Sequence, residues 1–215
     1  MNQRGYSGKR GPKALLFVLA LAFLPLANAT TVADLQAGWD NANFQLTGKE
    51  QSESFESLIA AADAYTAANP ADADGWVWSG IIKSSFAGID GGLGALGLAK
   101  QAKADFEQSL KLDANAMQGS ASTSLGTLYA GVPGWPLGFG DDKKAEEFLL
   151  KGLALDPAGI DSNYFYAKFL REEGRSPEAR KYYEAALLAP PRPGRAVADS
   201  GRQAEIRAAL AELNK

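Results

Sequence analysis

The chain has 215 residues, of which 22 are Lys or Arg, 25 are Asp or Glu, and none is His or Cys, so its formal net charge is −3 at pH 7. Without imidazole or thiol groups it has no Ser-His-Asp triad, no Cys nucleophile, no zinc site built from His or Cys, and no disulfide. The pI near 5.1 argues against a nucleic-acid-binding surface, which needs an excess of basic side chains, and the 46% hydrophobic content is typical of a globular domain.

The first segment, residues 1–29, has the pattern of a secretory signal peptide. Residues 1–13 carry four basic and no acidic side chains, residues 14–26 form an uncharged apolar run, and a small-residue step follows directly. The apolar run is too short to cross a membrane, which takes about 20 residues. We therefore expect cleavage after Ala29 and export to the periplasm, with no lipid attachment because the chain has no Cys. The alternative is an uncleaved N-terminal anchor.

The remaining residues, 30–215, are expected to form one all-helical domain with a net charge of −7. Val is scarce, strict apolar–polar alternation does not persist, and Ala, Leu, Glu, Lys and Gln dominate the runs between breakers. Breaker pairs such as Asn69-Pro70 and Asp156-Pro157 separate the runs. In chain order, the expected helices span 33–46, 50–68, 73–88, 98–112, 115–130, 141–155, 160–173, 176–189 and 199–213.

One pattern of small and large residues recurs three times, most completely between residues 158 and 191. There Ala167 and Ala179 stand 12 positions apart, and Tyr183 and Ala186 follow at the next offsets. These offsets resemble the 34-residue tetratricopeptide (TPR) helix pair, in which small residues let two helices approach closely. The other copies centre on two pairs of small residues, Gly80 with Ala102 and Gly126 with Ala145. The sequence therefore predicts an all-α, TPR-like solenoid of antiparallel helix hairpins.

Two of the copies carry insertions rich in Gly and Pro between their helices. Their small residues stand 22 and 19 positions apart, whereas the repeat needs about 12, and the extra residues fall at 88–97 and 131–140. Longer turns cost a solenoid little stability, and loops added on one side of the stack often build a binding face. We expect function to reside there.

The first insertion contains a glycine motif, Gly92-Leu-Gly94-Ala-Leu-Gly97, that matches the G-x-G-x-x-G of dinucleotide-binding proteins. That motif requires a strand before the glycines, inside a βαβ unit. No parallel sheet is predicted here, so we interpret the motif as a flexible turn between helices and expect no cofactor.

Acidic pairs along the chain do not indicate catalysis. Asp141-Asp142, Glu146-Glu147 and Glu172-Glu173 lie at helix starts or beside basic residues, where the helix dipole and i,i+4 pairing explain them. Other Asp residues lack the order of a calcium-binding loop. We therefore expect neither enzymatic activity nor a metal site.

The second insertion holds two aromatic residues, Trp135 and Phe139, in a loop stiffened by Pro133 and Pro136. Such a loop has one shape and holds both aromatic side chains in fixed positions. They either fill the gap that the inserted turn leaves or are displayed to a partner, and the sequence leaves both alternatives open.

Further aromatic residues lie on the first helix of each expected pair, the helix that lines the concave side of a TPR stack. There they either pack between helices, as we expect for Trp76 and Phe165, or form a groove for a peptide or an apolar ligand. Lys168 and Arg171 share a helix face with Tyr164 by i+4 and i+7 spacing. The candidate binding residues on these helices are Trp78, Tyr129, Tyr164, Tyr166, Lys168 and Arg171.

Three segments together resemble the T component of tripartite TRAP transporters, a family called TatT. The resemblance covers residues 33–213 and implies an exported TPR-like protein whose partner is the secreted solute-binding protein of such a transporter. Some members are lipoproteins, whereas this chain has no Cys to acylate. The segments that carry the resemblance are Gly134-Trp135-Pro136 with Gly138-Phe139-Gly140-Asp141, then Asn163-Tyr164-Phe165-Tyr166, and then Arg192-Pro193-Gly194-Arg195.

The function expected from the sequence is that of an exported scaffold, which binds a periplasmic solute-binding protein through the 131–140 loop and the concave groove. The alternative is a carrier that holds a small hydrophobic ligand in a tunnel between repeats. Arg192 and Arg195 either pair with an acidic partner or fix the last helix through Asp199.

Overall fold

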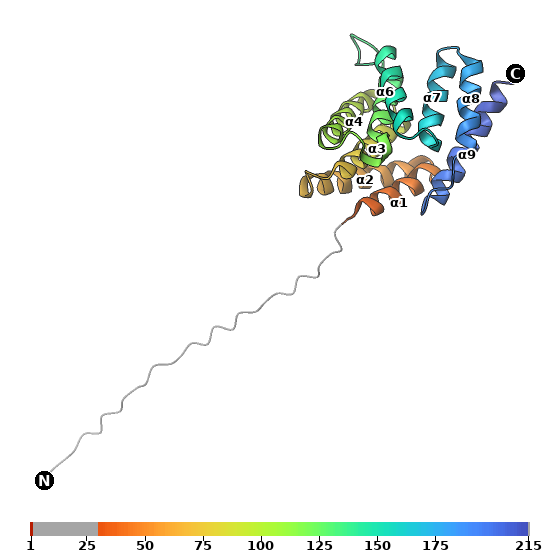
Figure 1. Cartoon of the computed structure of the whole chain (residues 1–215). Helices are drawn as coiled ribbons and strands as arrows, with labels where there is room; N and C mark the ends of the chain where they lie inside the picture. The colour runs from red at the N-terminus through yellow and green to blue at the C-terminus, as the bar shows by residue number, and fades with distance from the viewer. Residues whose placement is uncertain (2–29, 215) are drawn as a thin grey trace.

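The computed structural model describes residue 1 and residues 30–214, so the expected signal peptide lies almost entirely outside the described residues. The described part is all-helical, with nine α-helices and one short 3₁₀ turn, η1, at Ala116–Gly119 (Figure 1). In chain order the α-helices are α1 Val32–Phe44, α2 Gly48–Ala68, α3 Ala73–Asp90, α4 Gly92–Leu112, α5 Ser120–Gly131, α6 Asp142–Leu155, α7 Ile160–Glu172, α8 Ser176–Leu187 and α9 Ala196–Glu212.

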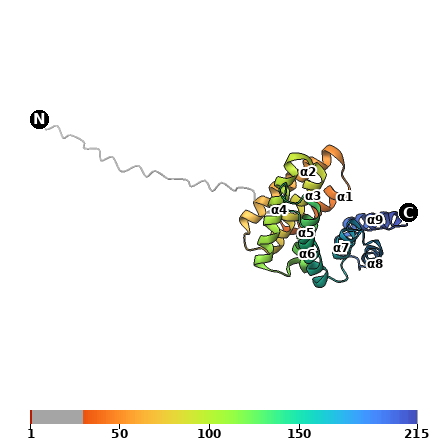
Figure 2. The ribbon, with the colours of Figure 1, turned by 90° about the horizontal axis from the view of Figure 1, so that it is seen from above.

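Consecutive helices pack as hairpins, and the hairpins stack side by side. The principal pairs are α3 with α4, α5 with α6 and α7 with α8, and α1 packs on α2 and α3. Figure 2 shows α5 and α6 between the α1–α4 group and the α7–α9 group. The predicted solenoid of antiparallel hairpins is confirmed. None of the described helices has the length and the apolar content needed to cross a membrane.

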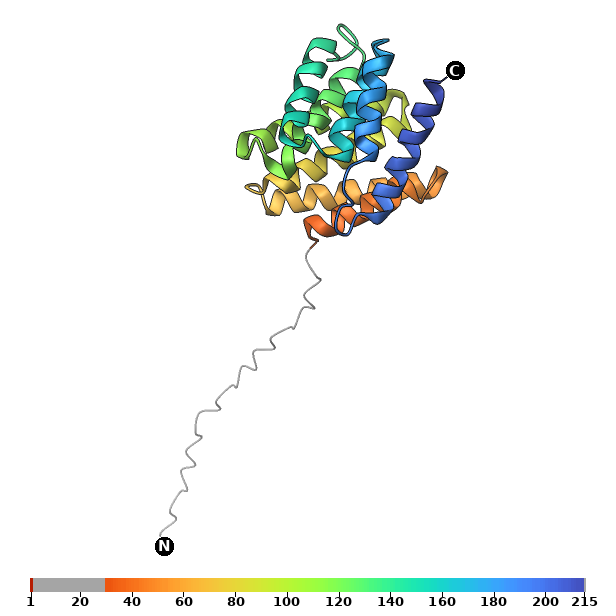
Figure 3. The ribbon, with the colours of Figure 1, turned by 45° about the vertical axis from the view of Figure 1, so that its right-hand side comes forward.

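The last helix, α9, has no hairpin partner and folds back on the beginning of the chain. It packs on α8 and also on α1 and α7, which brings the two ends of the solenoid together. Figure 3 shows the blue C-terminal helix lying against the orange N-terminal helices. The inner side of the stack is therefore bounded by both termini of the domain.

Small residues lie where helices cross, as the repeat pattern predicts. A Cβ atom on Gly126 of α5 would lie 2.6 Å from the Leu149 side chain and 2.8 Å from the Leu149 backbone nitrogen on α6. A Cβ atom on Gly80 of α3 would lie 2.5 Å from the Phe106 ring on α4. Ala167 of α7 is completely buried. Close backbone approach at these crossings thus depends on small side chains.

The first insertion does not form the flexible turn expected at 88–97. Helix α3 continues to Asp90, Gly91 turns the chain with a φ of 63°, and α4 begins at Gly92. The apolar side chains that follow are spaced at i, i+3, i+4 and i+7 and pack on the core: Ala95, Leu98, Ala99 and Ala102. Packing of this stripe outweighs the low helix propensity of the glycines, so the inserted residues lengthen both helices.

The helix expected at 115–130 is also different, because it is broken near its start. Met117 and Gln118 adopt left-handed φ angles of 46° and 55°, and Gly119 follows at 82°. Non-glycine residues in this region cost about 1–2 kcal/mol each, so such a turn persists only where the surrounding packing holds it. Helix α5 then begins at Ser120.

Candidate functional site

The inner side of the helical stack forms a cavity of about 1070 Å³. Helices α1, α3, α5 and α7 supply most of its wall. The rest comes from α4, α9, η1, Asp156, residues 192–195 and the α5–α6 loop (residues 132–141). A cavity of this size can enclose a small organic molecule or a short peptide segment. We therefore take it as the first part of the candidate site.

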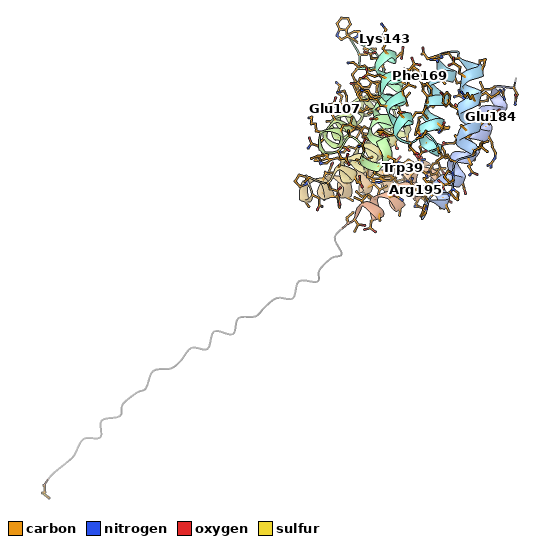
Figure 4. The ribbon with its side chains drawn as sticks, in the orientation of Figure 1. Trp39, Glu107, Lys143, Phe169, Glu184 and Arg195 are labelled. Carbon is orange, nitrogen blue, oxygen red and sulfur yellow. The ribbon has the colours of Figure 1, made fainter. Side chains whose placement is uncertain are left out.

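An ion pair between α1 and the start of α9 closes one end of the cavity. The Arg195 guanidinium donates from Nε and Nη2 to the Asp40 carboxylate, at 2.9 and 2.8 Å. It also stacks on Trp39 and Trp78, with its Cζ atom 5.8 and 5.1 Å from the two ring centroids. Figure 4 labels Trp39 and Arg195 side by side where α1 meets α9. Only 8% of Arg195 is exposed, so this pair belongs to the protein interior.

Two further arginines extend the ion-pair network along the same end. The backbone N–H and Nε of Arg192 donate to Asp199 at 2.8 and 2.7 Å, and Nη1 donates to Asp161 at 2.6 Å. Arg202 Nε donates to the second oxygen of Asp161 at 2.8 Å. The structure thus shows Arg192 fixing α9 through Asp199, one of the two alternatives that the sequence left open.

The paired arginines change the acidity of Asp161. Burial alone would raise the pKa of this carboxyl group, but the charges of Arg202 and Arg192 outweigh it and lower the pKa to about 2. Asp161 therefore remains ionised at any physiological pH and keeps both arginines in place.

Polar and aromatic side chains share the remaining wall. Tyr164 and Phe165 of α7 lie against the Arg202 guanidinium, with ring centroids 4.4 and 4.7 Å from its Cζ atom. The left-handed turn at Met117 and Gln118 also lines the cavity. One face of α5 contributes a row of hydroxyl groups, Ser120, Thr123, Ser124 and Thr127.

The α5–α6 loop forms the second part of the candidate site. Backbone bonds join Gly140 N–H to the Pro133 carbonyl at 3.0 Å and Gly138 N–H to the Gly134 carbonyl at 3.1 Å, which gives the loop a defined shape. At its tip the side chains of Trp135 and Leu137 are 90% and 73% exposed. The loop therefore displays two large apolar side chains on an ordered backbone.

Comparison with known proteins identifies the fold. No family model matches the chain, and no curated protein matches it. A solved structure, that of a thermophilic TPR protein from Thermus thermophilus, superimposes with a TM-score of 0.58 at 16% sequence identity and covers 84% of this chain and 89% of that one. The chain has a TPR-like fold. At this identity the likeness shows the fold alone.

Three of the predicted binding residues line the TPR-like cavity: Trp78, Tyr164 and Lys168. Trp78 is 1% exposed and forms part of the floor. Lys168 is half-exposed at the opposite end of α7 from Asp161, with its Nζ 4.0 Å from Glu172. The structure therefore brings these three residues to one surface from two helices, α3 and α7.

The aromatic pair Tyr129 and Phe139 packs outside the cavity. Their rings meet edge to face at 5.7 Å, and Tyr129 also stacks on Phe148 of α6 at 5.7 Å. Of the two loop aromatics, Phe139 thus anchors the loop to the helices and Trp135 is displayed. Packing against the helices therefore describes Phe139, and exposure at the loop tip describes Trp135.

Tyr166 and Arg171 lie on other faces of α7. Tyr166 is 4% exposed and its hydroxyl donates to Glu146 of α6 at 3.2 Å, while Arg171 pairs with Glu212 of α9 at 2.9 Å. Both side chains therefore join α7 to neighbouring helices rather than face the cavity.

Sequence reasoning missed Trp39, Asp161 and Arg202 as cavity residues. The repeat pattern describes contacts between neighbouring helix pairs, whereas Arg202 reaches Asp161 and Arg195 reaches Trp39 because α9 packs on α7 and α1. The sequence signal for these contacts was the Arg-Pro-Gly-Arg segment at 192–195. Its two arginines face inward and form ion pairs with acidic residues that are distant in the chain.

Proposed function

We propose that the chain is a TPR-like scaffold that binds a protein partner through the displayed tip of its α5–α6 loop. TPR-like folds are typical of protein–protein interaction and of non-enzymatic scaffolds. The observation that carries the proposal is the 90% exposure of Trp135 on an ordered loop, next to Leu137. Exposed Trp residues are rare on protein surfaces and dominate the energetics of many interfaces.

The attachment of the loop supports this role. Phe139 packs on Tyr129, and Asp141 N–H bonds to the Tyr129 carbonyl at 3.0 Å, so the loop base is tied to α5. Asp141 also accepts the N–H groups of Lys143 and Lys144 and caps α6. Because the loop backbone is already ordered, the binding of a partner over Trp135 costs little conformational entropy in the loop.

We further propose that the chain is exported after cleavage at Ala29 and that its partner is the solute-binding protein of a TRAP-type transporter. Support for this comes from the resemblance of the loop, of residues 163–166 and of residues 192–195 to the TatT family, and from the leader-like pattern of residues 1–29. In this role the scaffold holds its partner without covalent chemistry.

Site-specific photocrosslinking in living cells tests the proposal. A photoreactive amino acid at Trp135 is expected to crosslink a TRAP solute-binding protein, identified by mass spectrometry. The matched control is the same amino acid at Glu184, which is exposed on α8, away from Lys143 at the loop end of α6 (Figure 4). Equal crosslinking from both positions, or crosslinks at Trp135 to unrelated proteins only, would contradict the proposal.

The cavity favours a second candidate function, that of a carrier for a small ligand with apolar character. A volume of about 1070 Å³ lies at the upper end of the range for small-molecule sites. Native mass spectrometry of the purified protein would detect a bound molecule of this size, and a carrier is expected to release it on unfolding.

A further inference from the structure

The attachment of α9 to the stack is mostly polar. Of its buried side chains, Asp199 and Arg202 are charged, two are alanines, and Ile206 is the one large aliphatic group. Leu210 and Leu213 near its end are half-buried. The shorter helix α7 buries four large apolar side chains, Ile160, Tyr166, Phe169 and Leu170. Because burial of apolar surface is the main stabilising contribution, α9 gains less from its packing than α7 does.

Ion pairs and hydrogen bonds make up the rest of this attachment. When α9 leaves the stack, both partners of each pair regain water, so the desolvation penalty is recovered and the net cost of separation is small. A substitution that removes one partner differs, because it leaves a buried charge unpaired. The contacts are those of Arg195 with Asp40, of Arg192 and Arg202 with Asp161, of Arg171 with Glu212, and of Arg180 with Leu213 and Asn214.

The segment that precedes α9 belongs to the same unit. Arg192 donates from its backbone N–H and from Nε to Asp199 in the first turn of α9. Pro190 and Pro191, which come before it, are exposed and have no backbone N–H group to donate. Residues 192–214 are therefore one body that an exposed connector joins to α8.

This body forms part of the wall at the end of the cavity where Arg195 pairs with Asp40. On α7, Asp161 accepts a hydrogen bond from Arg202, and the Tyr164 ring centroid lies 4.4 Å from the Arg202 Cζ atom. If the body moves away, these α7 side chains face solvent and the wall loses five lining residues. They are Arg192, Pro193, Arg195, Arg202 and Glu205.

We propose that residues 192–214 act as a strap that detaches from α1 and α7 as one unit, while α1 to α8 remain folded, and so opens one end of the cavity. Local opening is typical of elements with few buried apolar contacts. The strap gives a large ligand, or a segment of a partner, access to the cavity without unfolding of the stack. The proposal goes beyond the functions proposed above and holds whichever molecule the cavity takes.

Native-state hydrogen exchange tests the strap in the unaltered chain. Exchange is followed by mass spectrometry at urea concentrations below the unfolding transition, and peptides from α9 are compared with peptides from α5 and α8. We expect α9 to exchange about a hundredfold or more faster than α5, at a similar rate from Ala198 to Ala209. The dependence of this exchange on urea is expected to be weaker than for α5, since opening of the strap exposes less surface.

Three results would overturn the proposal. Exchange of α9 at the rate of α5 would mean that it opens only when the whole domain unfolds. Exchange of α9 together with α8 would mean that the unit that opens is larger than the strap. A steady fall in exchange rate from Ala209 back to Ala198 would mean that the chain end frays instead of detaching as one body.

A reversible lock tests the same motion within one protein. A Cβ atom on Gly201 of α9 would lie 2.7 Å from Cγ of Phe44 at the end of α1. With a carbon–carbon bond of about 1.5 Å, the two Cβ atoms are at most about 4.2 Å apart, which suits a disulfide. Phe44→Cys with Gly201→Cys is therefore expected to bridge α1 and α9, and no other Cys competes in this chain.

The oxidised and reduced forms of this variant are matched controls for each other. Peptide mapping without reductant verifies the bridge. Oxidation is expected to slow exchange in α9 to about the rate of α5, and the reduced form is expected to keep the fast exchange. Equal exchange of α9 in both forms would show that its amides exchange without leaving α1 and would overturn the proposal. Should the bridge not form, the comparison of α9 with α5 and α8 in the unaltered chain decides it alone.

Discussion

Arg195 and Asp40 stand 155 positions apart in the chain and form a two-contact ion pair inside the protein. This pair joins the first helix to the start of the last one, at one end of the cavity on the inner side of the TPR-like stack. Burial raises the pKa of Asp40, and the hydrogen bond from Arg195 and its charge act in the opposite direction. The stability of this contact between α1 and the start of α9 therefore depends on both partners being present.

Breaking this pair is expected to cost much more than breaking a surface pair. Asp40→Ala leaves the Arg195 guanidinium buried without its counter-charge and is expected to lower the free energy of unfolding by about 3–5 kcal/mol. The control, Lys49→Ala, removes a pair with Glu53 whose side chains are 86% and 60% exposed, and is expected to cost less than about 1 kcal/mol. Urea denaturation measures both, and similar losses would contradict a structural role for the closure.

The Asp161 carboxylate makes stability depend on acid pH. Its folded pKa of about 2 lies below the unfolded value of about 3.9, so its stabilisation is complete above about pH 4 and is lost as the pH falls toward 2. Because 32% of the Asp161 side chain is exposed, solvent screening limits its contribution to the free energy of unfolding to about 1–2 kcal/mol. Urea midpoints at pH 5 and pH 2.5 are expected to differ more in the wild type than in Asp161→Asn. The same difference in both proteins would show that Asp161 does not contribute.

Two glycine-to-alanine substitutions test the helix crossings. Gly126→Ala places a Cβ atom against the backbone of Leu149, and we expect a loss of about 1–3 kcal/mol despite the better helix propensity of Ala. Gly97→Ala in α4 meets no atom within 4 Å and is expected to gain up to about 1 kcal/mol. Thermal unfolding compares the two, and stabilisation of both variants would mean that α5 and α6 do not cross closely.

The left-handed turn before α5 predicts an unusual response to glycine. Gln118 is exposed with a φ of 55°, so Gln118→Gly removes backbone strain and is expected to raise the free energy of unfolding by up to about 1 kcal/mol. Gln101→Gly, on the exposed face of α4, is expected to lower it by about 1 kcal/mol. Equal destabilisation by the two substitutions would show that residue 118 is not in a left-handed conformation.

Most helices were predictable because their ends carry explicit signals. Asp141 caps α6 and Asp156-Pro157 ends it, and these are local features that a sequence displays. At 92–97 the glycines suggested a turn, whereas the apolar spacing from Ala95 to Ala102 already indicated a helix. The structure has a helix where we predicted a turn, because packing of that apolar stripe on the core outweighs the low helix propensity of the glycines.

The candidate site was less predictable than the fold. Trp78, Tyr164 and Lys168 could be found because each lies on the first helix of a repeat, which faces the concave side. The ion pair between Arg195 and Asp40 could not be found in this way, since Asp40 lies outside the repeat pattern and 155 positions away in the chain. Contacts at that separation depend on how many repeats stack and on how α9 returns, which no local pattern specifies.

Docking of a protein partner through Trp135 is the central function proposed for the α5–α6 loop. Calorimetric titration of the proposed partner, a TRAP-type solute-binding protein, into wild type and Trp135→Ala tests it most directly, with thermal unfolding measured in parallel. Since Trp135 is 90% exposed, we expect an unchanged melting temperature and a dissociation constant raised about thirtyfold, the effect of losing a contact of about 2 kcal/mol. An equal dissociation constant for the two proteins would contradict the account.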